Sequence, residues 1–121
     1  MSEEMRPPGK TTIAPEVLVS IARLTALSVP GVSRLADADV LESVNRFFKR
    51  EQVNEGVKIT VENNTVYADL FVIIEHDMNV REVSRTIQSR VARAITEMVG
   101  MEVGRVNIHV EDIESTTAEP K

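Results

Sequence analysis

The sequence has no cysteine and no tryptophan, and its 121 residues include one tyrosine and three phenylalanines. Without cysteine the chain cannot form a disulfide scaffold, a thiol nucleophile or a Cys-ligated zinc site. No apolar run approaches the roughly 18 residues of a membrane-spanning helix. The first ten residues also lack the apolar core of a secretory signal. Together these absences predict a protein that is made and kept in the cytoplasm.

The chain carries 14 Lys and Arg residues against 19 Asp and Glu, which gives a net charge of −5, and 42% of its residues are hydrophobic. This composition is typical of a globular protein, and the length suits one domain with a two-layer core. The polar ends, residues 1–10 and 114–121, bury too little apolar surface to offset ordering entropy. We therefore expect a single domain over residues 11–113 between two flexible tails.

Two segments show the 3.6-residue periodicity of helices. The first begins at Pro15, which suits the first position of a helix, and stops before Pro30; its apolar stripe includes Val17, Ile21 and Leu24. The second covers residues 79–99, with Asn79 as the predicted N-cap and Gly100 as the left-handed residue that follows. Its apolar stripe consists of Val80, Val83, Ile87, Val91, Ala94, Ile95 and Met98. Helical spacing also occurs over residues 39–50.

A β-hairpin is predicted where apolar and polar residues alternate, over residues 57–61 and again over residues 66–74. The Asn-Asn pair at 63–64 tolerates positive φ and provides a two-residue turn. This turn fixes the pairing and places Lys58 opposite Asp69. A slip by one residue would lose both the apolar match and this charge pair, so the alternation predicts the register as well as the hairpin.

Two more strands are predicted, over residues 31–35 and 105–113. The long hairpin strand, the second helix and the last strand form a β-α-β unit, whose strands are parallel. Because the hairpin strands are antiparallel, the sheet is mixed. The sequence therefore predicts an α+β fold, a two-layer sandwich in which two main helices pack on one face of a small mixed sheet.

Motifs for catalysis or cofactor binding are missing: the chain has no phosphate-binding glycine loop, no G-x-S-x-G and no paired metal-binding histidines. His76 lies between two acids, and His109 precedes Glu111 and Asp112. Either histidine could serve as a base or a metal ligand, but a polar loop and a solvated strand face explain both groups. We expect no enzyme, no catalytic residue, no cofactor, no metal and no small-molecule substrate. A metal-dependent or small-molecule enzyme using one of these histidines is an alternative.

Basic residues gather on the second helix and suggest an interaction surface. Four arginines at positions 81, 85, 90 and 93 face only two acids on that helix. They are explained by a solvated helix face, or by docking to an acidic protein or an anionic lipid surface. With Arg46, Lys49 and Arg50 they also offer an alternative function, a nucleic-acid-binding module, although stacking aromatic residues are scarce and the net charge is negative.

Large apolar side chains on the long strand suggest a second surface. Phe71 and Ile73 point away from the face that the helices cover, so they either lie under residues 39–50 or form an exposed patch that favours self-association. The candidate interaction surface consists of Arg81, Arg85, Arg90, Arg93, Tyr67, Phe71 and Ile73.

Several short motifs follow one another in a characteristic order: Ile13-Ala14-Pro15-Glu16-Val17, Pro30-Gly31-Val32, Gly56-Val57, Ile87-Gln88, Val106-Asn107-Ile108 and Glu111-Asp112-Ile113. In this order and spacing the sequence resembles the alkaline shock / envelope stress response family of bacteria over about residues 10–113. It departs from that family over residues 33–52 and at residues 75–77, where relatives often carry a Tyr-Gly-type turn.

The resemblance implies a small cytoplasmic α+β domain without enzymatic activity. Some members of the family are abundant at the cytoplasmic side of the membrane in Gram-positive bacteria, where a separate membrane-anchored protein recruits them. They are linked to cell-envelope stress and can self-associate. The resemblance thus implies a binding or scaffold protein that associates with itself and with a membrane-anchored partner, in the cytoplasm or at the inner face of the membrane. It carries over no catalytic residue.

Overall fold

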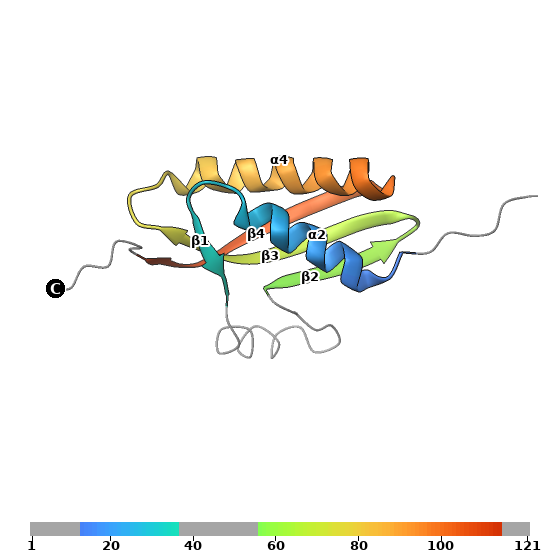
Figure 1. The fold of residues 1–121 in the computed structure, drawn as a ribbon, viewed down its shortest axis with the longest axis horizontal. Coiled ribbons are helices and arrows are strands. Elements are labelled where there is room, and N and C mark those ends of the chain that lie inside the picture. Colours follow the sequence, from blue (N-terminus) through green and yellow to red (C-terminus); the bar gives the residue numbers. More distant parts are fainter. Residues whose placement is uncertain (1–12, 37–55, 115–121) are drawn as a thin grey trace, which may run out of the picture.

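The structure is a computed structural model that describes residues 13–36 and 56–114. In chain order its elements are α2 (Pro15–Leu27), β1 (Val32–Leu35), β2 (Val57–Glu62), β3 (Thr65–Glu75), α4 (Val80–Val99) and β4 (Glu102–Glu114) (Figure 1). The predicted tails, apart from Glu114, and the helical pattern over residues 39–50 lie outside the described residues. The predicted α+β fold is confirmed.

β3 is the central strand of the four-stranded sheet. β4 pairs with it in parallel along its whole length. The other edge of β3 is shared by two antiparallel strands, β2 beside its first half and β1 beside its last residues. At their junction, the N–H of Phe71 donates to the carbonyl of Gly56 and the carbonyl of Phe71 accepts from the N–H of Ala36, both at 2.8 Å. The sheet is therefore mixed, as predicted.

The hairpin has the predicted register. Lys58 pairs with Asp69 across β2 and β3, and their side chains approach to 3.8 Å between Nζ and Oδ2. The turn residues Asn63 and Asn64 have φ of 52° and 61°, the left-handed conformation that asparagine tolerates. Local turn chemistry and strand alternation were thus sufficient to align these two strands.

The ends of α4 also follow their local sequence signals. The side-chain oxygen of Asn79 accepts the N–H of Glu82 at 3.1 Å, which satisfies one of the free donors of the first turn. Gly100 has φ of 74° and ends the helix; a residue with a side chain rarely adopts this conformation. Both predicted ends of α4 are confirmed.

β4 begins at Glu102, three residues earlier than the sequence predicted. The β3–β4 ladder shifts twice, and these shifts leave Gly104 and Glu111 as extra residues of β4. A Cβ atom on Gly104 would lie 2.5 Å from Cε1 of Tyr67, so only glycine allows the tyrosine ring to lie so close. The bulge and the glycine interrupt the alternation, and this hid the first part of the strand.

The core lies between the two helices and one face of the sheet. β3 contributes every second residue from 66 to 74, and such residues share one face. The helices contribute Leu18, Ile21, Ala22, Ala26, Val83, Ile87, Val91 and Ile95. Both helices therefore pack on the same face, as predicted, and Figure 1 shows α2 lying beside α4 across the strands.

Replacing Ile87 by Asp should prevent folding, because this side chain is fully buried and the carboxylate would have no partner in the core. Ile87→Ala should lower the free energy of unfolding by about 2–5 kcal/mol. Urea unfolding followed by circular dichroism measures both effects. Ser89 is exposed on the same helix, so Ser89→Ala should change stability by less than about 0.5 kcal/mol. If Ile87→Asp unfolds at the parent's urea concentration, the assignment of the buried face is wrong.

Candidate interaction surfaces

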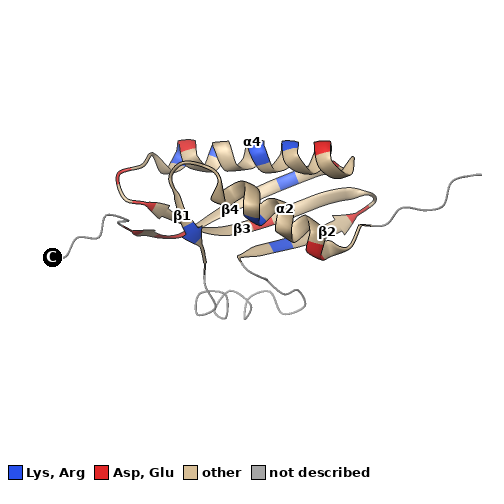
Figure 2. Cartoon of the chain, in the orientation of Figure 1, with Lys and Arg blue, Asp and Glu red and all other residues tan. Residues whose placement is uncertain are grey.

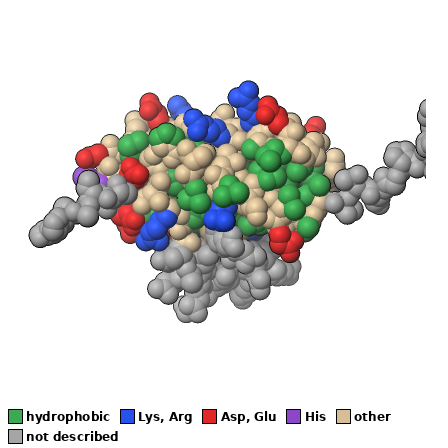
Figure 3. All heavy atoms as spheres, viewed as in Figure 1, with side chains coloured by type: hydrophobic (Ala, Val, Ile, Leu, Met, Phe, Trp, Pro, Cys, Tyr) green, Lys and Arg blue, Asp and Glu red, His purple; other side chains and the backbone are tan. Residues whose placement is uncertain are grey.

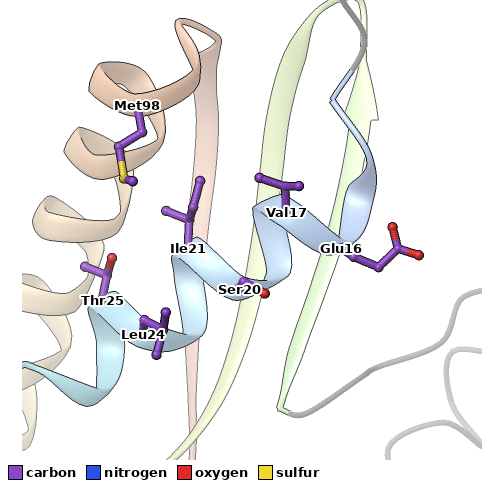
Figure 4. A pocket seen from close by; sticks show the side chains of 7 residues that line it. All are labelled: Glu16, Val17, Ser20, Ile21, Leu24, Thr25 and Met98. Atoms are coloured by element: carbon purple, nitrogen blue, oxygen red, sulfur yellow. The ribbon is translucent and has the colours of Figure 1, made fainter.

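A hollow of about 380 Å³ lies between α2 and the last turns of α4. Its apolar lining consists of Val17, Ile21 and Leu24 from α2 and Met98 from α4, and we call these four residues the helix groove. Figure 4 shows Val17 and Ile21 projecting from α2 on the side where Met98 extends from α4, while Glu16 points away. Hydrophobic side chains also gather on the helix-bearing face of the molecule in Figure 3.

The helix groove exists because α2 has two apolar flanks. Leu18 and Ala22 face the sheet and are buried, whereas Val17 and Leu24 lie on the neighbouring flank and are 44% and 60% exposed. Sequence periodicity predicted a stripe of Val17, Ile21 and Leu24 but could not tell what covers it. In the structure Ile21 alone of these three is buried.

Met98 is more exposed than the sequence pattern predicted. The apolar stripe of α4 included it, yet it is 69% exposed. It lies on the same side of α4 as Ile95, but the hollow separates its side chain from α2 (Figure 4). The stripe therefore continues beyond the part of the helix that the core covers.

The four arginines of α4 are all exposed, but they do not form a single stripe. At about 100° per residue, Arg81 and Arg90 lie about 180° apart around the helix. Arg93 is 3.1 Å from the carboxylate of Glu97, one turn further along. Figure 2 shows acidic residues among the basic ones on α4. The positive charge is therefore spread over the outer half of the helix and partly neutralised, unlike the concentrated basic surface typical of a nucleic-acid reader.

The sheet face opposite the helices, which we call the open face, carries a polar cluster around Asp69. Its Oδ1 accepts the side-chain N–H of Asn107 at 3.1 Å and lies 2.9 Å from Nε2 of His109. Lys58 approaches the other carboxylate oxygen, and Phe71 stacks on the ring of His109 with centroids 4.5 Å apart. Asp69 thus ties together side chains from β2, β3 and β4.

Sequence reasoning grouped His109 with Glu111 and Asp112, but the structure pairs it with Asp69 of the neighbouring strand. His76 lies on the exposed turn after β3, 3.3 Å from the carboxylate of Asp77. Five strand residues, about 16 Å, separate His76 from the sheet position beside His109, so the two histidines do not meet. In the described parts of the chain, no group of three or more His, Cys, Asp or Glu residues could hold a metal ion.

The three predicted surface residues of β3 lie on the open face. Phe71 and Ile73 are each 2% exposed, although they point away from α2 and α4, and Tyr67 is half-buried over Gly104. Phe71 and Ile73 therefore present little apolar area to a partner. Residues 39–50, which the sequence offered as their cover, lie outside the described residues.

Residues 3–115 match a family described as the alkaline shock protein 23 family, with cell envelope-related function. The chain belongs to this alkaline shock protein family. Its relatives include Spy1535 of Streptococcus pyogenes, 33% identical with 87% of this chain and 79% of the relative covered, and YloU of Bacillus subtilis, 25% identical with 96% and 98% covered. Both relatives are described as uncharacterized proteins. The match confirms the family resemblance predicted from the residue motifs.

Solved structures support the fold. This alkaline shock family chain resembles a variant of MamM CTD with a TM-score of 0.53 and 13% identity, over 81% of this chain and 94% of that one. A manganese form of MamM CTD gives a TM-score of 0.50 with 12% identity, over 82% and 99%. At such low identity these likenesses show a shared fold alone. Neither described helix is long and apolar enough to cross a membrane.

Asp69→Asn should destabilise the protein by about 1–2 kcal/mol, because the amide cannot replace the charged acceptor that serves Asn107, His109 and Lys58. Asp77→Asn is the matched control: it removes the same charge from a largely exposed side chain and should change stability by less than about 0.5 kcal/mol. Urea unfolding at pH 7 measures both. Equal midpoints for the two variants would show that the Asp69 cluster adds nothing to stability.

Proposed function

We propose that this chain is a non-enzymatic binding protein of the cell envelope, whose helix groove holds a segment of a membrane-anchored protein. The family description supports the connection with the envelope. The observation that carries the proposal is the exposure of Leu24 and Met98 on two adjoining helices. Exposed apolar groups that line a shared hollow are typical of interaction sites.

The shape of the helix groove favours an amphipathic helix as the bound segment. Val17, Ile21 and Leu24 recur at intervals of four and three along α2, the spacing with which one helix packs against another. The polar residues of the lining, apart from Glu16, are the uncharged Ser20 and Thr25. An apolar anchor can therefore enter without burying a charge next to it.

The charge on α4 indicates which charge the bound segment should carry where it passes this helix. α4 carries four arginines against Glu82 and Glu97, a local charge of 4 − 2 = +2, whereas the whole chain carries −5. Exposed charges of this kind chiefly steer association and specificity. The partner segment should therefore be acidic where it passes α4 and apolar where it enters the groove.

The surroundings of the two histidines favour catalysis less than the helix groove favours binding. His109 lies against Asp69 and Phe71, and His76 lies on an exposed turn beside Asp77. The two rings lie far apart, and the polar partner of each is a carboxylate. An arrangement for general-base catalysis requires a base that reaches a reacting group in a pocket. These contacts instead favour a role of His109 in stabilising the sheet.

Binding of the full-length protein to membranes of its own cells tests the proposal. The parent should sediment with untreated membranes, but neither with membranes shaved by protease nor with vesicles made from the extracted lipids, because the partner is a protein. Leu24→Asp and Met98→Asp should each weaken binding at least tenfold, since each places a charge in the apolar anchor site. Met78→Asp, the same type of change outside the helix groove, should bind like the parent.

Arg85→Ala tests the charge argument separately. It should leave the unfolding midpoint unchanged and weaken membrane binding about two- to fivefold at low salt, with less effect at high salt. Binding to protein-free anionic vesicles would instead identify a lipid surface as the ligand. Binding to labelled RNA or DNA at low salt would favour the nucleic-acid alternative. Equal binding of Leu24→Asp and the parent would contradict docking in the helix groove.

A further inference from the structure

β4 has one edge that no described strand pairs with. It forms its ladder with β3 along its other edge. A free edge presents a row of N–H and C=O groups that can pair with another chain. β4 is 13 residues long, whereas β1 and β2 have four and six. The outer edge of β4 is therefore the longest edge that the described strands leave free.

The hydrogen bonds of Phe71 determine which residues of β4 face this edge. Phe71 directs both its N–H and its C=O toward β1 and β2. Successive strand residues direct these groups to opposite edges, so Leu70 directs its groups toward β4. In a parallel ladder Leu70, which lies beside Ile108, bonds to the residues on either side of its neighbour. Ile108, with Val106 and Val110, therefore turns its backbone groups outward.

We propose that a second copy of this chain pairs with the outer edge of β4, antiparallel to it and related by a two-fold axis at Ile108. In this register Ile108 forms a hydrogen-bonded pair with Ile108 of the second copy. Val106 forms another such pair with Val110 of the second copy, and symmetry repeats it. The outward N–H and C=O groups of all three residues then find partners.

Charge complementarity selects this register. With the axis at Ile108, Arg105 lies opposite Glu111 of the second copy, one position beyond the hydrogen-bonded pairs, and symmetry forms this pair twice. Both side chains are exposed in the single chain. Moving the axis by one residue places Arg105 opposite either His109 or Ile113 and loses both charge pairs. Opposite charges facing each other across strands stabilise one register over its neighbours.

Two bulges define the length of the paired segment. Gly104 and Glu111 are the extra residues of β4, and bulges tend to end pairing at sheet edges. The hydrogen-bonded pairs of the dimer, within residues 106–110, lie between them, and the pair of Arg105 with Glu111 flanks this segment at each end. So short a segment buries little area, and interfaces below about 1,200 Å² are weak and transient. The dimer should form at high local concentration and dissociate on dilution.

Gln88 of α4 competes with the second copy. Its side-chain amide donates to the carbonyl of Val106 at 3.0 Å, and this carbonyl is one of those that face the outer edge. Pairing with Val110 of the second copy requires Gln88 to move away. Covering an edge in this way is a common protection against uncontrolled strand pairing. Gln88 therefore weakens the dimer and sets the concentration at which it forms.

The dimer goes beyond the proposed function, because it uses none of the residues of the helix groove. The two interactions can therefore fail separately. Variants of the β4 edge should lose the dimer and still bind membranes, and Leu24→Asp should lose membrane binding and still form the dimer.

Sedimentation equilibrium of the purified full chain, from about 10 μM to about 1 mM, tests the dimer. Arg105→Glu and Glu111→Arg should each raise the dissociation constant about tenfold or more, because each creates two like-charge pairs. The double variant Arg105→Glu/Glu111→Arg should restore the parent's value within about threefold. Gln88→Ala should lower the dissociation constant about three- to tenfold.

Ile108→Pro should abolish the dimer and leave the circular dichroism spectrum unchanged, because proline removes an N–H that faces outward and none that bonds to β3. Arg93→Glu is the matched control for charge, and its dissociation constant should equal that of the parent. A chain that is monomeric throughout this range overturns the proposal. So does a dimer that ignores the charge swap, or one that Leu24→Asp disrupts.

Discussion

Burial of β3 on both faces and along both edges is the constraint on which the rest of the fold depends. Its even-numbered residues pack under α2 and α4, and Phe71 and Ile73 on the other face are equally inaccessible. β4 covers one edge, and β1 with β2 covers the other. A strand so enclosed must satisfy every backbone group within the sheet. Surfaces for other molecules are consequently left to the periphery, on the outer flank of α2, the outer half of α4 and the far edge of β4.

The two faces of the sheet are stabilised in different ways. The face under the helices is held mainly by apolar burial, since no polar or charged side chain among the described residues is fully buried. The open face is held partly by directional contacts of Asp69 with Asn107 and His109. Directional contacts specify register, because they require particular residues to lie side by side. Asp69 can therefore fix the alignment of β3 with β4, which the apolar alternation leaves free to shift by two residues.

Features set by neighbours in sequence could be predicted, and those set by distant neighbours could not. The hairpin register follows from the Asn63–Asn64 turn, and the ends of α4 follow from Asn79 and Gly100. The contact of Asp69 with His109 depends on a parallel ladder whose strands are joined through a 20-residue helix. Two bulges also shift that ladder, so counting along the sequence gives the wrong neighbours.

The candidate surfaces, too, could be predicted only as far as they depend on neighbours in sequence. Periodicity placed Val17, Leu24 and Met98 on apolar stripes, and their positions on the helices are as predicted. Their exposure depends on how α2 lies against α4, because the hollow is lined by side chains of both helices. The packing of α2 against α4 cannot be predicted from the sequence of either helix alone. The four arginines of α4 were visible in the sequence, but their spread around the helix follows from the 3.6-residue turn and becomes decisive once the buried face is known.

The hydrogen bonds of Phe71 have a consequence for how the chain can vary. Ala36 and Gly56, the last residue before the undescribed stretch and the first after it, both bond to the backbone of this one residue. The chain thus leaves the sheet and returns to it at the same place. The entropy of closing a loop changes slowly with its length, so a longer or shorter stretch could be spliced in between these two points without displacing β3. The scaffold therefore sets where the chain leaves and re-enters the sheet, but places no tight limit on the length of sequence between these two points.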